Sequence, residues 1–390
     1  MLPIIFAFAG PELTADERAF FQATDPAGFI LFKRNCETPD QLRALTDSLR
    51  DLSGRADVPI LIDQEGGRVA RLGPPHWPVF PNGEIFGRLY EKAPMSALEA
   101  ARVNALAIAR LLFDLGINVD CLPVLDVPSA ECHDVIGDRA YGTDPMRVAA
   151  LGEFTLRGLR EGGVVGIVKH IPGHGRAAAD SHLELPVVTA SREELETDLA
   201  PFRKLKDAPM AMTAHVTYTA LDPDRCASLS PVVVGEVIRG NIGFDGLLMC
   251  DDLSMKALGG SFAERTRGVF AAGCDVALHC SGDFAEMTEI ADAAPAMTDA
   301  GLDRLARAMA WADGRSQADP AELAAKRDAL LALALRKGAS PKFPSPLRER
   351  EGPAKWEGEG EVSAAADARA SDATFPPSSS PRRRGPSPHK

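Results

Sequence analysis

Residues 169–182 hold the densest group of acid–base side chains in this 390-residue chain. The segment reads Lys-His-Ile-Pro-Gly-His-Gly-Arg-Ala-Ala-Ala-Asp-Ser-His and follows the apolar run 164–168. In Asp180-Ser181-His182, a carboxylate two residues from an imidazole is able to orient the ring and stabilise its protonated form. Such a pair suits a general acid and base near neutral pH, so the pattern predicts an active-site loop at the end of a strand.

The three histidines of this loop also raise the possibility of a metal site. His170 and His174 have the i, i+4 spacing of zinc ligands on a helix. Pro172 and Gly173 lie between them and disfavour a helix, and the loop contains no cysteine. We therefore predict no metal, and we expect His174 to satisfy backbone groups of the loop.

A second group of acidic side chains ends the apolar run 246–250. Asp251 and Asp252 are adjacent there, and Leu-Ser-Met follows them. Capping and the helix dipole favour an aspartate at the start of a helix, and we expect Asp252 to have this structural role. Asp251, at the tip of the strand, is the candidate nucleophile.

A third group combines Asp63, which directly follows the run 58–62, with Arg71 and Arg139. Charged donors and acceptors of this kind suit a ligand with many hydroxyl groups, because they form charge-assisted hydrogen bonds. Ion pairing within the protein explains the arginines equally well. Gly66 and Gly67 follow Asp63, but the segment has neither the Gly-x-Gly-x-x-Gly spacing nor the Walker spacing of nucleotide-binding loops.

The elements that position these residues are short apolar runs that alternate with helical segments. Eight runs are candidate strands, at 3–9, 28–32, 58–62, 116–121, 164–169, 209–214, 246–250 and 274–279. Parallel strands need helical crossovers, so the alternation favours a parallel sheet. A doubly wound sheet shows the same alternation. Eight runs, with polar residues just after many of them, favour a single-domain (β/α)₈ barrel of the TIM type, in which the carboxyl ends of the strands meet at one mouth.

Helix-start signals support this division of the chain. Four segments match a capping box and begin at Thr14, Thr38, Ser96 and Ser191. Gly116 follows an apolar-periodic segment at 97–115, where a left-handed residue ends a helix. The segment 301–337 is predicted to form terminal helices on the same domain.

Composition limits the partners and the compartment. The formal net charge is −12, which disfavours a nucleic-acid partner. Seven cysteines without a Cys-x-x-Cys pair are typical of a reducing cytosol. Residues 1–10 lack a basic flank and are too short to span a membrane, so we interpret them as a first strand of a cytoplasmic, monomeric protein. We predict a catalytic domain at 1–337 and a disordered, Pro- and Ser-rich tail at 338–390.

In combination, these motifs resemble glycoside hydrolase family 3. They are Asp63-Gln-Glu-Gly-Gly-Arg-Val-Ala-Arg71, Gly137-Asp-Arg139, the loop 169–182, and Asp251-Asp-Leu-Ser-Met255. Within the family they are similar to the single-domain bacterial β-N-acetylglucosaminidases, and the resemblance covers about residues 1–335. Ile171 and Cys250 depart from the usual aromatic residue and serine, and neither is a reacting group.

The resemblance implies a retaining enzyme that needs no metal or organic cofactor. Asp251 is then the nucleophile and His182 the proton donor and acceptor, with Asp180 as the partner that orients His182. The sugar-binding residues implied are Asp63, Arg71, Arg139, Lys169 and His170. The implied substrates are N-acetylglucosaminyl-β-1,4-anhydromuramyl peptides from cell-wall recycling. A β-N-acetylglucosaminide phosphorylase and a non-catalytic muropeptide-binding protein are the alternatives, and the residues between His170 and Asp180 are expected to be a hinge.

Overall fold

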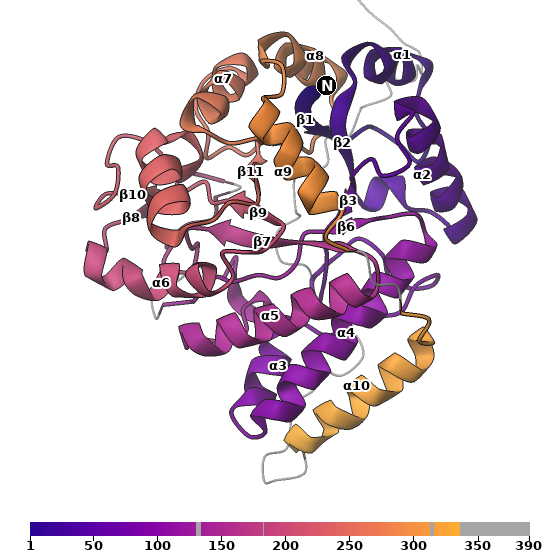
Figure 1. Cartoon of the computed structure of the whole chain (residues 1–390), viewed down its shortest axis with the longest axis vertical. Coiled ribbons are helices and arrows are strands. Elements are labelled where there is room, and N and C mark those ends of the chain that lie inside the picture. The colour runs from indigo at the N-terminus through magenta and orange to yellow at the C-terminus, as the bar shows by residue number, and fades with distance from the viewer. Residues whose placement is uncertain (130–133, 182, 313–315, 336–390) are drawn as a thin grey trace, which may run out of the picture. The chain divides into compact units, whose positions relative to one another are not determined.

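The computed structural model describes residues 1–129, 134–181, 183–312 and 316–335. Within them, eight parallel strands close into a barrel, and their order around the barrel follows their order along the chain (Figure 1). The strands are β1 (Leu2–Phe6), β2 (Pro26–Leu31), β3 (Ile60–Ile62), β6 (Val119–Asp120), β7 (Val165–Ile171), β9 (Met210–Thr213), β11 (Leu247–Asp252) and β12 (Val276–His279). Each overlaps one of the eight predicted runs. The (β/α)₈ barrel is confirmed, and the doubly wound alternative is wrong because the sheet closes on itself.

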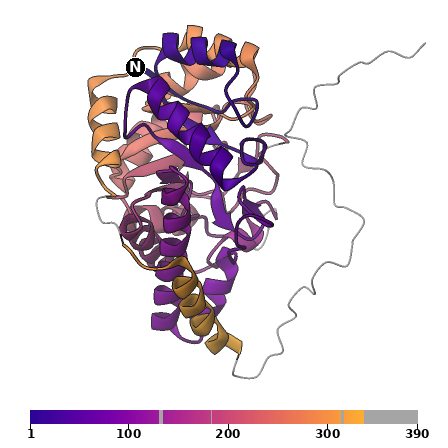
Figure 2. The same cartoon turned by 90° about the vertical axis from the view of Figure 1, so that its right-hand side faces the viewer.

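Helices connect the strands on the outside of the barrel (Figures 1 and 2). They are α1 (Ala15–Thr24), α2 (Pro39–Ser53), α3 (Gly83–Tyr90), α4 (Pro94–Asp114), α5 (Pro145–Glu161), α6 (Arg192–Lys204), a π-helical segment (Val232–Ile242), α7 (Phe262–Ala272) and α8 (Phe284–Ala293). Two short sheets, β4 (Gln64–Gly66) with β5 (Val69–Ala70) and β8 (Val187–Val188) with β10 (Thr217–Tyr218), follow barrel strands.

The predicted helix starts are confirmed in part. Full capping boxes form at Thr14 and Ser191. At Thr38 the side chain accepts a hydrogen bond from the Gln41 amide, but Gln41 reaches the Glu37 amide instead of completing the box. The prediction at Ser96 is wrong: α4 begins at Pro94, a residue suited to the first helical position because it needs no hydrogen-bond acceptor for its nitrogen.

The end of α4 was predicted correctly. Its C-cap is Leu115, and Gly116 has a φ of 77°, the left-handed conformation in which glycine carries no steric penalty. A side chain at this position would also approach Thr46 Oγ1 to 2.4 Å. Both the backbone angle and the neighbouring helix therefore require glycine here.

The two terminal helices pack on different parts of the barrel domain. Leu305 and Ala308 of α9 (Asp299–Met309) join the core formed by inward-facing strand residues such as Val119 and Val165, so α9 closes the amino-terminal end of the barrel. The last helix, α10 (Pro320–Leu335), packs against α3 and α4 (Figure 2). The predicted tail at 338–390, with its boundary at 337, lies outside the described residues.

Candidate active site

The inward-facing core residues locate the site at the carboxyl end of the barrel. Leu61, Ile167 and Met249 belong to the core inside the barrel. Because side chains alternate along a strand, the residues two positions later point to the same side. These residues are Asp63, Lys169 and Asp251, and the mouth opposite α9 therefore brings together three of the predicted site residues.

A buried ionic network occupies one side of this mouth. Lys169 Nζ lies 2.9 Å from Asp63 Oδ1 and 2.7 Å from Glu65 Oε1. Arg139 donates two hydrogen bonds to Glu65, of 2.8 and 2.9 Å, and Arg71 donates one of 3.0 Å to Asp63. The structure therefore brings together four of the predicted sugar-binding residues, and Glu65 joins them as a second carboxylate.

The charges of the network hold one another in their ionised forms. Burial alone would raise the pKa of Asp63, but Lys169 and Arg71 outweigh it and hold that pKa well below its usual range. Burial likewise opposes ionisation of Glu65, whose pKa Arg139 and Lys169 nevertheless lower to about 2. In the same way Asp63 and Glu65 overcome the burial of Lys169 and raise its pKa. The ammonium group therefore stays charged in a buried position.

Glu65 was not among the predicted site residues. It stands on β4, two positions after Asp63, and sequence reasoning treated it only as part of a motif. Its position beside Asp63 and next to a glycine pair was a signal that it belongs to the same site. Its role as the shared partner of Lys169 and Arg139 depends on a loop from elsewhere in the chain.

Asp126 organises the start of the loop that follows β7. Its Oδ2 accepts a 2.7 Å hydrogen bond from His170 Nδ1, and its Oδ1 accepts the backbone amides of His170 and His174. Burial raises the pKa of Asp126, but the two histidines outweigh it and lower the pKa to about 2. A carboxylate that accepts at Nδ1 leaves Nε2 as the second polar atom of the His170 ring. Asp126 was not among the predicted site residues.

The two adjacent aspartates form the end of β11 and have different contacts. Asp251 Oδ1 accepts the backbone amide of Asp252 at 2.8 Å. Asp252 accepts the amides of Ser254 and Cys280, at 2.9 and 3.0 Å, so its contacts are structural, but they are not those of a helix start. The expected helix after Asp252 is wrong, because turns follow and α7 begins only at Phe262. Asp252 thus holds a strand end against β12 and caps no helix.

His215 supports this strand end from the neighbouring strand. Its Nε2 donates to the carbonyl oxygen of Asp252 at 3.0 Å, and its Nδ1 lies 2.8 Å from the hydroxyl of Ser228. Burial lowers the pKa of His215 and so favours the neutral ring, and the carbonyl acceptor requires a proton on Nε2. The nucleophile candidate is therefore carried by a strand end that is bonded from two sides.

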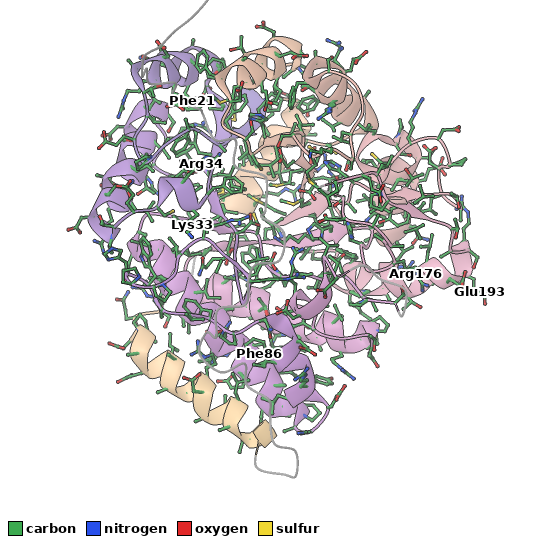
Figure 3. All side chains as sticks on the ribbon, turned by 180° about the vertical axis from the view of Figure 1, so that it is seen from behind. Phe21, Lys33, Arg34, Phe86, Arg176 and Glu193 are labelled. Carbon is green, nitrogen blue, oxygen red and sulfur yellow. The ribbon has the colours of Figure 1, made fainter. Side chains whose placement is uncertain are left out.

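The rest of the 169–182 loop is anchored over its first half. The Gly173 carbonyl accepts the hydroxyl of Tyr218 at 2.7 Å, and the Gly175 carbonyl accepts the amide of Ser129 at 2.8 Å. Arg176 donates to Asp198 at 2.6 Å and to the carbonyl of Glu194, and Figure 3 shows it near the start of α6. The expected hinge therefore does not begin directly after His170.

The other histidines of the loop have separate environments. We expected the ring of His174 to satisfy backbone groups of the loop; its Nε2 lies 3.1 Å from the hydroxyl of Ser181. Asp180 is half-buried, and its carbonyl accepts the amides of Leu183 and Glu184. His182 lies outside the described residues. Among the residues that are described, no three His, Cys, Asp or Glu side chains gather so as to hold a metal ion.

No helix in the described ranges combines the length and the apolar character needed to cross a lipid bilayer.

Comparison with known proteins agrees with the geometry of this mouth. Residues 8–307 match the glycosyl hydrolase family 3 N terminal domain. A beta-hexosaminidase of Aromatoleum aromaticum is 38% identical over 286 residues, which are 72% of this chain and 79% of that protein. The beta-hexosaminidase of Methylococcus capsulatus is 37% identical over 344 residues, 84% of this chain and 94% of its own length.

Solved structures of the same family superpose on the barrel. NagZ from Neisseria gonorrhoeae, in complex with N-trifluoroacetyl-D-glucosamine, has a TM-score of 0.75 and 32% identity, and the match covers 85% of this chain and 98% of that one. A family 3 β-N-acetylglucosaminidase from Paenibacillus sp. has a TM-score of 0.71 and 30% identity, over 90% of this chain and 65% of its own. The chain therefore belongs to glycosyl hydrolase family 3 and is a glycoside hydrolase.

Proposed function

We propose that the protein is a retaining exo-β-N-acetylglucosaminidase. Its substrates are terminal, non-reducing N-acetylglucosamine residues of GlcNAc-β-1,4-(anhydro)MurNAc peptides released from peptidoglycan. The observation that carries the proposal is the buried network of Asp63, Glu65, Arg139 and Lys169 at the barrel mouth that also holds Asp251. Relatives named beta-hexosaminidase, and a neighbour solved with an N-acylated glucosamine, support the same sugar.

The network suits the hydroxyl groups of one sugar ring. Each oxygen of Asp63 accepts one hydrogen bond, from Lys169 or from Arg71, and a carboxylate oxygen has room for a second donor. His170, with Nδ1 bonded to Asp126, presents Nε2 as a further polar atom. We therefore assign Asp63, Arg71, Arg139, Lys169 and His170 to sugar binding. Because their positions are set before substrate arrives, little ordering cost remains for binding.

Two steps of chemistry follow from the remaining residues. In the first, a carboxylate oxygen of Asp251 bonds to the anomeric carbon while the glycosidic bond breaks, and His182 gives its proton to the departing oxygen. In the second, His182 takes a proton from water, which attacks the anomeric carbon and releases Asp251. Asp180 orients the imidazole in both steps. Two inversions at one carbon retain its configuration.

The cellular setting belongs to the same proposal. We infer a cytoplasmic monomer whose catalytic domain spans residues 1–337 and whose partner is a small-molecule muropeptide. A net charge of −12 supports the absence of a nucleic-acid partner. Cytosolic cell-wall fragments are the substrate class that fits this location.

The test is hydrolysis of a GlcNAc-anhydroMurNAc peptide followed by proton NMR of the first sugar released. Initial release of the β-anomer is expected, whereas initial α-anomer contradicts a retaining mechanism. Added phosphate separates the alternatives, because a phosphorylase forms the sugar 1-phosphate and a hydrolase forms free N-acetylglucosamine. A slow fluoroglycoside is expected to label Asp251, which peptide mass analysis detects. Binding without any turnover would instead indicate a non-catalytic muropeptide-binding protein.

A further inference from the structure

His174 has no part in the mechanism above, although it lies in the same loop and is only 2% exposed. Its Nε2 lies 3.1 Å from the hydroxyl of Ser181, which is also buried. Ser181 stands between Asp180 and His182 in the sequence. We propose that His174 is a positioning residue, whose bond to Ser181 holds the chain beside the proton-transfer pair. This inference rests on the proposed roles of Asp180 and His182.

The His174 end of the bond belongs to the rigid part of the barrel mouth. The backbone amide of His174 donates to Asp126 Oδ1 at 2.7 Å, and the flanking carbonyls of Gly173 and Gly175 accept the bonds from Tyr218 and Ser129 already described. A Cβ at Gly175 would lie 2.0 Å from the Val127 carbonyl oxygen, so the backbones are in direct contact. The ring therefore has a position that the barrel determines.

The Ser181 end belongs to a segment with a different set of bonds. Ala178 is exposed, and Ala179 and Asp180 are half-buried. The bonds from the Leu183 and Glu184 amides to the Asp180 carbonyl close a local turn and do not reach the barrel. The Ser181 hydroxyl reaches back to His174 across seven residues. Losing this bond would keep the local turn but would remove a connection between that turn and the barrel.

The protonation state of His174 suits a permanent bond. Burial and the neighbouring His170 lower the pKa of His174 to about 4, against the opposing charges of Asp126 and Asp251. Its Nδ1 has no hydrogen-bond partner among the described residues. A buried N–H without an acceptor is rarer than a buried acceptor without a donor, so the proton lies on Nε2 and is donated to Ser181. The ring is therefore neutral above about pH 5 and donates its single proton to Ser181.

Loss of this bond is expected to affect proton transfer more than sugar binding. A poor leaving group such as an alkoxide needs the general acid, whereas a nitrophenolate departs with little help. With Ser181→Ala, kcat/KM for an alkyl N-acetyl-β-glucosaminide should fall about five- to tenfold, the range expected for one hydrogen bond. By the same reasoning, kcat/KM for the nitrophenyl glycoside should fall by less than about threefold. Inhibition by free N-acetylglucosamine should not change, because the substitution leaves Asp63 and Lys169 untouched.

The decisive experiment is a double-mutant cycle on the alkyl substrate, with circular dichroism and melting curves to check the fold. If the two residues act through one bond, kcat/KM of the double variant, His174→Leu with Ser181→Ala, should be no lower than that of the less active single variant. His174→Gln keeps an N–H near the position of Nε2 and should recover most of the activity lost in His174→Leu. Additive losses, or equal losses for both leaving groups, would overturn the proposal.

Ser281→Ala is the matched control, because it removes a hydroxyl 2.9 Å from another histidine nitrogen, Nε2 of His279. Any loss that it causes should be the same for both substrates. A larger loss with the alkyl substrate in this control would also overturn the inference. A wild-type enzyme that hydrolyses neither substrate would instead contradict the proposed function, and this outcome is distinct from a failed cycle.

Discussion

Glu65→Gln should expose how much the buried network at the barrel mouth stabilises the fold. The substitution keeps the size of the side chain but removes the charge that Lys169 and Arg139 share. Those cations, after the opposing effect of burial, lower the pKa of Glu65 from its usual 4.5 to about 2. At 1.36 kcal/mol per pKa unit, the ionised carboxylate contributes about 3 kcal/mol to the free energy of unfolding. Cutting one member from a buried ion pair costs a similar amount, about 3–5 kcal/mol.

The pH dependence of this loss has a definite sign. A carboxylate with a depressed pKa in the folded state stabilises the protein fully above its unfolded pKa, near 4.5. The contribution declines as pH falls from there toward 2. Urea unfolding of both proteins, followed by tryptophan fluorescence, should give a difference of about 3 kcal/mol that is constant between pH 5.5 and 7. The difference should shrink below pH 4.5.

A matched control is Glu84→Gln, which removes the charge of an exposed i, i+4 pair with Arg88. Exposed pairs of this kind contribute about 0.5 kcal/mol or less. If Glu65→Gln costs no more than this control at pH 7, the reasoning about the buried network is refuted. If the difference in unfolding free energy between the wild type and Glu65→Gln grows as the pH falls, the assigned direction of the pH dependence is refuted.

Further predictions concern the reacting groups and their support. Asp251→Ala should abolish turnover of every N-acetylglucosaminide, and near wild-type rates would contradict its role as nucleophile. His182→Ala should slow alkyl glycosides far more than aryl glycosides in steady-state assays, and equal losses would refute the general-acid role. Asp126→Asn should favour the opposite tautomer of His170 and raise KM at least about tenfold, with nitrogen-15 NMR reporting the tautomer. An unchanged tautomer would show that Asp126 does not control the ring.

The barrel was predictable because its signals are local. Apolar runs of strand length and polar residues directly after them depend only on neighbours in sequence, and each run contains or overlaps a barrel strand. The error at Ser96 also has a local cause. Pro94 offers a better first residue two positions earlier, and Glu99 pairs with Arg102 instead of the helix start. Competing start signals within one turn are what sequence patterns resolve least well.

The partners of the site residues were less predictable because they come from distant segments. Asp63 directly follows β3, as predicted, whereas Lys169 lies within β7, which continues to Ile171; strand ends are local features. Both residues contact one network with Glu65 and Arg139. This network depends on contacts between distant loops, because Arg139 and Glu65 are 74 residues apart in the sequence. Ion pairing and sugar binding seemed to be competing explanations of Arg139. The geometry directly supports ion pairing. Sugar binding by Arg139 also needs this ion pair, because the pair holds the guanidinium in place.

The glycines of the histidine-rich loop show why mobility cannot be inferred from composition alone. Glycine allows a chain to move, but it also allows two backbones to touch. At Gly173 a Cβ would lie 2.9 Å from Cβ of Asp198, and at Gly175 it would lie 2.0 Å from the Val127 carbonyl oxygen. Both glycines are buried and their carbonyls accept hydrogen bonds, so here they serve close packing. Any motion that brings the proposed acid–base pair to a substrate is therefore expected to arise after Arg176, where the Ser181–His174 bond opposes it.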